Sequence, residues 1–432
     1  MISRMVAILV LLLTGCALFA QSAASAPDVS NQALLDRLQQ MEKRILELED
    51  RQRKLEAALA GTGHPEMIAA NTAANTAAPA PAQGAKPSMP GHLEEHATVR
   101  EESMHYPSLQ IRGFGDVDFA ATDQKGSTSG FDLGQFVLHM ASPLSQKVSY
   151  FGEVSFTATP STYDLSVERS IIRYDYNDSF KMSFGKYHTP LGYWNAAFHH
   201  GAWLQTTISR PEMVKFGGQF VPVHFLGVLA EGKIPSGGIG LGYSAGIGNG
   251  RSSILSKAGD SGDINNSRAW IAGLDARPSG LYGLQVGASV YRDKLTPAPG
   301  SNFDEWIESA HVVWTKEHPE FLSEFFNVSH HDVLTQRNYN SQAFYVQFAY
   351  RLPWQENKWK PYYRFEYIHR PNVEPVWDFS GTSGVVDVVG STAGVRFDIT
   401  NYAAFKGEYR STRHGVNEPR VNGAFFQTAF TF

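Results

Sequence analysis

From Ser108 onward, apolar and polar residues alternate in short stretches that recur about every twenty residues along the chain. In the first stretch, Ile111, Val117 and Phe119 fall on one face and Asp116 falls on the other. Successive side chains of a β-strand point to opposite faces, so a strand with lipid on one side and water on the other needs this pattern. The alternation therefore predicts a wall of membrane-spanning strands.

We expect sixteen such strands between Ser108 and the C-terminus. Their expected ranges are 108–120, 131–142, 146–158, 165–176, 179–187, 219–233, 237–247, 267–277, 282–292, 303–316, 320–331, 341–352, 358–370, 385–398, 401–412 and 420–432.

The connections between these strands alternate between short and long. Tight turns follow the even-numbered strands, except that the connection from Pro353 to Asn357 is slightly longer, and an intermediate connection, 159–164, follows the third strand. The other odd-numbered connections are long, at 121–130, 188–218, 248–266, 293–302, 332–340, 371–384 and 413–419. Outer-membrane barrels have short periplasmic turns and longer outer loops, and closure of the barrel leaves no edge strand unpaired. The sequence therefore predicts an all-β fold, a 16-stranded antiparallel transmembrane β-barrel over 108–432.

The composition agrees with such a wall and excludes several function classes. Charged residues make up 18% of the chain and aromatic residues 12%, and the net charge is −5. No strongly basic field suggests a nucleic-acid partner. The one cysteine, Cys16, lies in the leader, so a disulfide framework or a cysteine-based metal site is not expected.

Residues 1–26 are expected to be a signal peptide. Arg4 supplies the positive charge, and an apolar run from Val6 to Leu13 precedes small residues. Leu13-Thr14-Gly15-Cys16 also matches a lipoprotein cleavage pattern. Two alternatives stay open: Cys16 is lipidated, or it is removed with the leader.

Residues 31–60 differ from the rest of the chain. Leucine, isoleucine and methionine recur there at alternating spacings of four and three, with charged residues of both signs between them. This heptad pattern predicts a coiled-coil helix, with Gln52 at a core position, which would join identical subunits in the periplasm. An amphipathic helix lying on the membrane is the alternative, and the mixed charge disfavours it. Residues 61–107, rich in Ala and Pro, are expected to be a disordered, flexible linker.

The last strand ends in an aromatic residue. Phe426, Phe430 and the terminal Phe432 share one face of the alternating pattern. Outer-membrane barrels typically carry such a terminal aromatic residue for recognition by their assembly machinery, so Phe432 is the candidate assembly signal.

The longest connection, after the fifth strand, begins with Phe184-Gly-Lys-Tyr-His-Thr-Pro-Leu-Gly-Tyr-Trp-Asn195. This segment, with the strand count, resembles the trimeric Gram-negative outer-membrane porins, in which the loop after strand 5 folds into the lumen. The coiled coil makes the chain most similar to the phosphate-selective and dicarboxylate-type porins. The resemblance implies a homotrimer in the outer-membrane lipids and a constriction at this loop.

The candidate constriction and pore-lining residues are mostly basic or aromatic. The loop carries histidine, arginine and lysine with one acid, Glu212, and carboxylate clusters are typical of cation-selective constrictions. Weak anion preference or poor selectivity is therefore expected, unless the wall arginines pair with neighbouring acids. The aromatic residues either pack the loop against the wall or stack on solutes. The candidates are His188, Tyr193, Trp194, His199, His200, Arg210 and Lys215 in or beside the loop, and Arg112, Arg364, Arg396, Lys406 and Arg410 on the wall.

Enzymatic and metal sites are disfavoured. Gly242-Tyr-Ser244-Ala-Gly246 matches a nucleophile pattern but lies in an expected strand with no helix after it. The pairs His199-His200 and His330-His331 lack the spacing and carboxylate of a metal site. No cofactor is expected.

The preferred hypothesis is therefore a passive diffusion porin for small hydrophilic solutes. The alternative is a structural barrel that its coiled coil ties to the cell wall. A barrel lipase would rest on Ser244 alone.

Overall fold

The computed structural model describes residues 43, 107–198, 201–298, 300–378 and 384–432. The expected signal peptide (1–26) and nearly all of the expected coiled coil (31–60) and linker (61–107) lie outside these residues. Lys43, the one described residue in the coiled-coil range, is helical. No helix among the described residues is long and apolar enough to cross a membrane.

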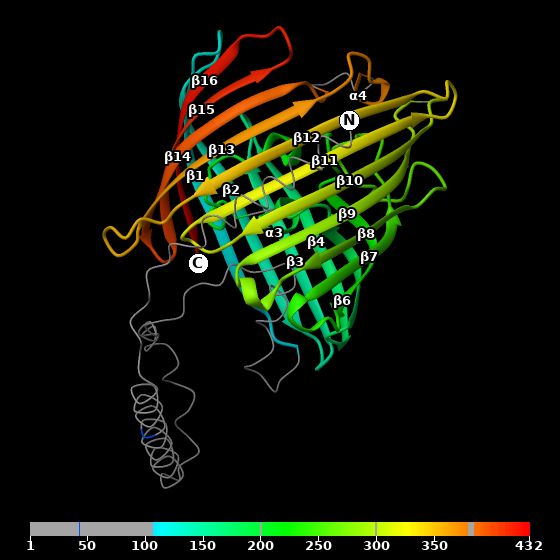
Figure 1. Ribbon diagram of the computed structural model, residues 1–432, viewed down its shortest axis with the longest axis horizontal. Helices are drawn as coiled ribbons and strands as arrows, with labels where there is room; N and C mark the ends of the chain where they lie inside the picture. Colours follow the sequence, from blue (N-terminus) through cyan, green and yellow to red (C-terminus); the bar gives the residue numbers. More distant parts are fainter. Residues whose placement is uncertain (1–42, 44–106, 199–200, 299, 379–383) are drawn as a thin grey trace. The chain divides into compact units, whose positions relative to one another are not determined.

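Sixteen antiparallel strands form one closed barrel, in which each strand pairs with its neighbours in sequence and β1 pairs with β16 (Figure 1). This confirms the predicted strand number and closure. The strands are β1 Gln110–Thr122, β2 Gly130–Pro143, β3 Val148–Ala158, β4 Tyr163–Asn177, β5 Phe180–His188, β6 His224–Ile234, β7 Leu241–Asn249, β8 Ala269–Ala276, β9 Leu284–Leu295, β10 Phe303–Trp314, β11 Glu320–Asp332, β12 Asn338–Ala349, β13 Trp359–His369, β14 Val388–Thr400, β15 Ala403–His414 and β16 Arg420–Thr431.

Within the described part of 107–432, short helices occur only in the connections between strands. They are α3 Trp194–Ala197, η2 Glu212–Val214, η3 Gly237–Ile239, η4 Ser279–Leu281 and α4 Pro375–Asp378.

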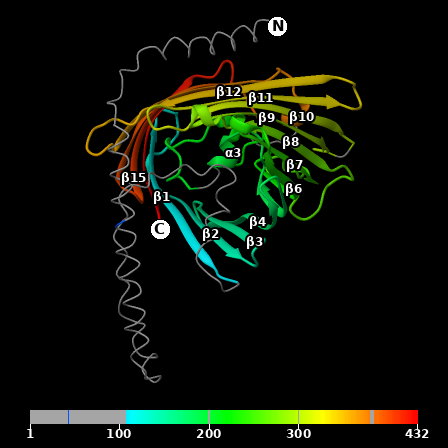
Figure 2. The ribbon, with the colours of Figure 1, turned by 60° about the horizontal axis from the view of Figure 1, so that its bottom comes forward.

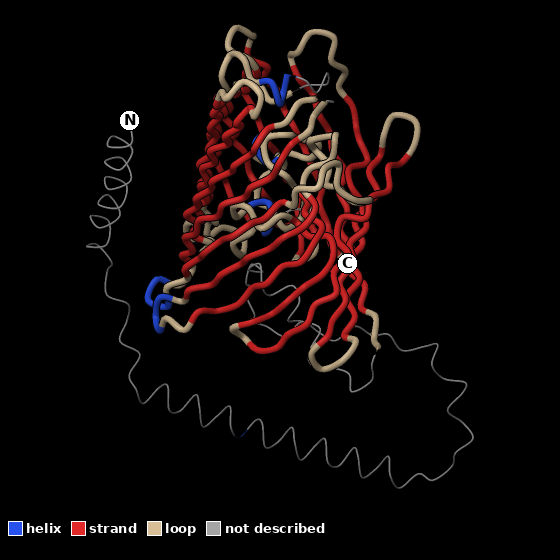
Figure 3. Tube along the Cα trace, turned by 90° about the vertical axis from the view of Figure 1, so that its right-hand side faces the viewer, coloured by secondary structure: helices blue, strands red, loops and turns tan. Residues whose placement is uncertain are grey.

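Turns gather at one end of the barrel and the longer loops at the other (Figure 3). Several expectations about the connections were wrong. The connections after β6 and β8, 235–240 and 277–283, are longer than the expected tight turns, and each contains a short helix. The connection after β11 spans only 333–337, because both strands extend further than the alternation suggested. The connection after β12, 350–358, is longer than expected, and it contains three consecutive non-glycine residues with positive φ, Gln355, Glu356 and Asn357.

The barrel closes where the last strand meets the first. The Gly113 N–H donates to the Phe432 carbonyl oxygen at 2.9 Å, and the Phe432 N–H donates back at 3.0 Å. The Phe432 ring lies over Gly113, where an added Cβ would fall 2.2 Å from a ring carbon. A larger residue at position 113 would therefore force the terminal phenylalanine ring to move from its place across the neighbouring strand.

One sector of the inner wall is more apolar than a water-filled lumen predicts. On β11, Leu322, Phe326 and Val328 are buried on the same face as Glu324. A hydrophobic cluster joins this face to residues of the connection after β5. The inward face can be apolar there because that connection covers it.

Candidate functional site

The described residues of the connection between β5 and β6, 189–198 and 201–223, lie inside the ring of strands (Figure 2). We call this connection the internal loop. Its side chains and backbone contact inward-facing residues of β11, β13, β14 and β15. Two of its parts are attached in different ways: the first segment, Leu191–Phe198, and the middle segment, Ala202–Glu212.

The first segment is attached mainly by apolar burial. Trp194 is fully buried, and its ring lies edge-on to Tyr345 of β12 at 5.8 Å between centroids. The carboxylate of Glu324 accepts hydrogen bonds from the backbone N–H groups of Tyr193 and Trp194 and from the Tyr345 hydroxyl. This single wall carboxylate satisfies the first backbone donors of α3, which have no partner within the helix.

The middle segment is attached by charged wall side chains that bind its backbone. Lys406 of β15 donates from Nζ to the carbonyl oxygens of Ala202 and Thr207, the latter at 3.0 Å. Arg364 of β13 donates to the Ser209 carbonyl oxygen at 2.8 Å.

Arg396 of β14 extends this set of donors. Its Nη1 donates to the carbonyl oxygens of Trp203 at 2.7 Å and Gln205 at 3.0 Å. Together the three cations satisfy loop carbonyls that would otherwise be buried without a donor.

Wall carboxylates complete the attachment by accepting from the loop. Glu408 of β15 accepts from the Ile208 N–H at 2.9 Å and from the Ser209 hydroxyl at 2.8 Å. Glu366 of β13 accepts from the Glu212 N–H at 2.7 Å. Cations and carboxylates alternate along the wall beneath the loop, so much of their charge is neutralised locally.

At η2 the loop meets the C-terminal end of β15. Glu212 pairs with Lys215 at 2.6 Å and with His414 at 3.1 Å. Burial alone would raise the pKa of the Glu212 carboxyl. The hydrogen bond from His414 and the charge of Lys215 outweigh burial and lower it to about 2. Glu212 is therefore ionised at neutral pH.

The loop's starting point is also held by polar contacts. Nε2 of His188, at the end of β5, lies 3.4 Å from the Glu153 carboxylate of β3. His139 and Arg169 contact the same carboxylate, and His224 contacts Glu168 at 2.8 Å. Among the described residues, no group of His, Cys, Asp or Glu is placed to hold a metal ion.

Most of the residues predicted for the constriction are brought together at the internal loop. His188, Tyr193, Trp194, Arg364, Arg396 and Lys406 are buried between loop and wall. The Lys215 side chain is 52% exposed, and the Arg210 guanidinium lies 4.0 Å over the Phe216 ring. His199 and His200 lie outside the described residues.

Two predicted wall cations are less covered than the others. Arg112 of β1 is exposed, and Arg410 of β15 is 24% exposed, with its guanidinium 3.7 Å over the Phe425 ring. These two residues, with Lys215, carry the more accessible positive charge of the predicted set.

The sequence does not predict that wall carboxylates hold the loop. Glu366 and Glu408 are expected there only as partners of wall arginines, and they do pair with Arg364 and Arg410. Loop atoms also donate hydrogen bonds to four carboxylates: Glu320, Glu324, Glu366 and Glu408. For two of these carboxylates the sequence contains a signal, because Glu320 and Glu324 interrupt the apolar face of β11. Ser244 lies in the middle of β7, paired with Glu231 and Gly273 in a continuous sheet, and not at a strand-to-helix turn.

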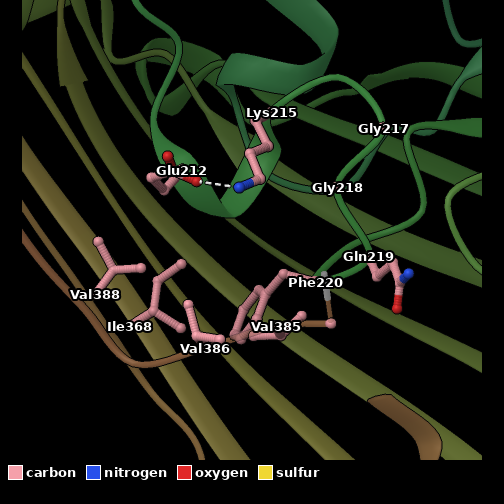
Figure 4. Close-up of a pocket in the computed structure, with 11 residues that line it drawn as sticks. Glu212, Lys215, Gly217, Gly218, Gln219, Phe220, Ile368, Val385, Val386 and Val388 are labelled. Atoms are coloured by element: carbon pink, nitrogen blue, oxygen red, sulfur yellow. Dashed lines mark ion pairs between the residues drawn. The ribbon is translucent and has the colours of Figure 1, made fainter. Parts of the chain in front are cut away.

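A hollow of about 420 Å³, open to solvent, lies between the end of the internal loop and the connection after β13. In Figure 4, Glu212 and Lys215 form one side, and Ile368, Val386 and Val388 line the other. The hollow thus has a charged side and an apolar side.

The sequence matches no protein-family model. It also matches no curated protein. The structure is similar to an anion-selective porin from Comamonas acidovorans, with a TM-score of 0.54 at 10% identity over 76% of this chain and 100% of that one.

Two further solved structures are similar. The outer membrane channel DcaP of Acinetobacter baumannii has a TM-score of 0.54 at 11% identity over 77% of this chain and 99% of that one. OmpT, an outer membrane protein of Vibrio cholerae solved in a trimer form, has a TM-score of 0.50 at 15% identity over 76% and 99%. At these identities the shared property is the fold, the 16-stranded barrel of outer-membrane porins.

Proposed function

We propose that this chain is an outer-membrane porin, a passive channel for small hydrophilic solutes, with the internal loop as its constriction. The observation that carries the proposal is the placement of the described residues of the internal loop within a closed 16-stranded barrel. A barrel of this size leaves room for an aqueous channel, and a loop fixed across the lumen sets the size limit of the solutes that pass.

We further propose weak anion preference and a homotrimer. Arg112, Arg410 and Lys215 supply accessible positive charge, whereas Arg364, Arg396 and Lys406 are engaged by loop carbonyls. The selectivity is therefore expected to be weak. The similar barrels described as an anion-selective porin and as a trimer support both parts of this proposal. The closer relation to phosphate-selective or dicarboxylate-type porins stays a prediction, since the coiled coil lies outside the described residues.

The test is single-channel conductance of the purified, folded protein in a planar bilayer with a salt gradient. Stepwise openings in groups of three would support a trimeric pore, and the sign of the reversal potential would give the selectivity. A folded barrel that conducts no ions would contradict the proposal and favour the structural alternative, a barrel tied to the cell wall.

A further inference from the structure

A second buried charge network lies at the N-terminal end of β10 and the C-terminal end of β11, apart from the residues that hold the middle segment. At its centre is His330 of β11, which is 1% exposed. Its Nε2 lies 3.0 Å from the Glu305 carboxylate of β10, and its Nδ1 lies 3.0 Å from the Glu374 carboxylate. Glu374 directly precedes α4 in the connection between β13 and β14.

The geometry favours a ring that carries two protons. An ionised carboxylate only accepts hydrogen bonds, and a neutral imidazole has a single N–H. With ring nitrogens 3.0 Å from the oxygens of two ionised carboxylates, both contacts are hydrogen bonds only when the ring carries two protons. His330 between Glu305 and Glu374 therefore acts as a cationic bridge between the wall and the loop.

On the side of α4, Asp378 accepts from the Glu374 backbone N–H at 2.9 Å and pairs with Arg370 at 2.7 Å. Further charged and titratable groups around the bridge belong to β9 and to the connection after β7. Arg251 lies 3.2 Å from Glu305, and its backbone N–H donates to Asp293 at 2.8 Å. The Tyr291 hydroxyl also donates to Asp293. Arg251 donates further to the carbonyl oxygens of Gln219 and Phe220 at the end of the internal loop.

The two carboxylates of the bridge are not equivalent. Glu305 keeps the cation Arg251 if His330 becomes neutral. Glu374 then retains only the backbone N–H of Trp377, at 3.1 Å, among the described contacts. Loss of the proton would thus leave a buried carboxylate facing a nitrogen lone pair, and the contact that breaks is the one to Glu374.

Breaking that contact would also affect the internal loop, because α4 packs against the end of the loop. Trp377 of α4 stacks on Phe220 at 5.5 Å and lies edge-on to the His330 ring at 5.2 Å. The bridge, α4 and the end of the internal loop are therefore packed as one unit. We propose that His330, Glu305 and Glu374 form a pH-sensitive latch, which holds the α4 segment against the barrel while His330 is protonated and releases it at alkaline pH.

The test measures release directly and does not depend on conduction, so it can fail or succeed separately from the proposed porin function. Val376 is fully buried in α4, and Val373, just before it, is 64% exposed. In folded full-length protein in membranes, the Val376→Cys and Val373→Cys variants are labelled with a charged maleimide at neutral and alkaline pH. The rate at Val376→Cys is divided by the rate at Val373→Cys, which removes the intrinsic pH dependence of the thiol, and protein without an introduced cysteine gives the background from Cys16.

The normalised rate is expected to rise roughly ten- to hundredfold at alkaline pH, the effect of losing one charge-assisted hydrogen bond. The matched control is His331→Gln, since His331 is the adjacent histidine but is exposed and contacts Asn338. This control should keep the rise.

Two variants discriminate the mechanism. In Glu374→Gln the amide can donate to the unprotonated nitrogen, so the normalised rate should stay low at both pH values. In His330→Gln the rate should be high at both. Two results would overturn the latch: a normalised rate that does not change with pH when His330 and Glu374 are intact, or a rise that persists in Glu374→Gln. Neither result depends on whether His330→Gln folds.

Discussion

The first and middle segments of the internal loop lie in the same lumen but are held by different interactions. Apolar burial dominates in the first segment, and hydrogen bonds to charged wall residues dominate in the middle segment. The first segment, Leu191–Phe198, is held by a buried indole and one carboxylate, Glu324. The middle segment, Ala202–Glu212, is held by charged wall residues that bind its backbone carbonyl and N–H groups. The first attachment depends on loop side chains, whereas most of the second depends on the wall. The sequence of the middle segment is therefore freer to vary than that of the first.

The largest effect is expected from Trp194→Ala in the first segment. Emptying a fully buried tryptophan site costs about 3–5 kcal/mol, and few polar contacts compensate for it there. Hydrogen-exchange protection of the amides in 191–198 should fall roughly hundred- to thousandfold. The control Trp354→Ala changes an indole that is 63% exposed in the turn after β12, and should leave that protection unchanged. Equal loss in both variants would contradict an apolar attachment.

The next largest effect is expected from Lys406→Met in the middle segment. Methionine has a similar volume but leaves the carbonyls of Ala202 and Thr207 without a donor, at about 1–3 kcal/mol for each group. Exchange in 202–208 should accelerate while 191–198 stays protected. Lys316→Met, at an exposed lysine in the turn after β10, is the control. Acceleration of both segments together would show that the two attachments are not independent.

The contrast between the segments also explains which features the sequence could predict. Alternation over strands such as β13 gave the strand number and closure, because period-two patterning follows from having lipid on one side. It also placed Trp194 and Lys406 at the loop and on the inner face. It could not show that Lys406 and Arg364 bind loop carbonyls. Every residue carries a backbone carbonyl, so the residue types in the loop do not reveal which carbonyls are bound. Nor could it show that Leu322 and Phe326 face inward, since β11 carries large apolar residues on both faces.

A smaller effect, confined to the end of the middle segment, is expected at acidic pH. The folded-state pKa of Glu212 is about 2, below its ordinary value of 4.5, so its ion pairs contribute stability above pH 4.5. That contribution should be lost as the pH falls from 4.5 toward 2. Exchange at 212–215 should therefore accelerate over this range in the unaltered protein. In Glu212→Gln, exchange at 212–215 should be faster at every pH and should lack that pH dependence. The control Glu356→Gln, at a carboxylate that is 86% exposed, should behave like the unaltered protein.

The smallest effect is expected from Arg410→Gln. This variant distinguishes wall cations that bind the loop backbone from wall cations that attract ions in the lumen. Arg410 lies on β15 like Lys406, but its described contacts are with Glu408 and Phe425, not with the loop backbone. Its removal should leave exchange in 202–208 nearly unchanged and shift the reversal potential toward cations. The change in permeability ratio should be less than about fivefold, as expected for one partly exposed, paired charge. Arg420→Gln, on the outer face of β16, is the control and should shift nothing. If Arg410→Gln loosened the middle segment as much as Lys406→Met, the wall cations would act as one network, and loop attachment and selectivity could not be varied separately.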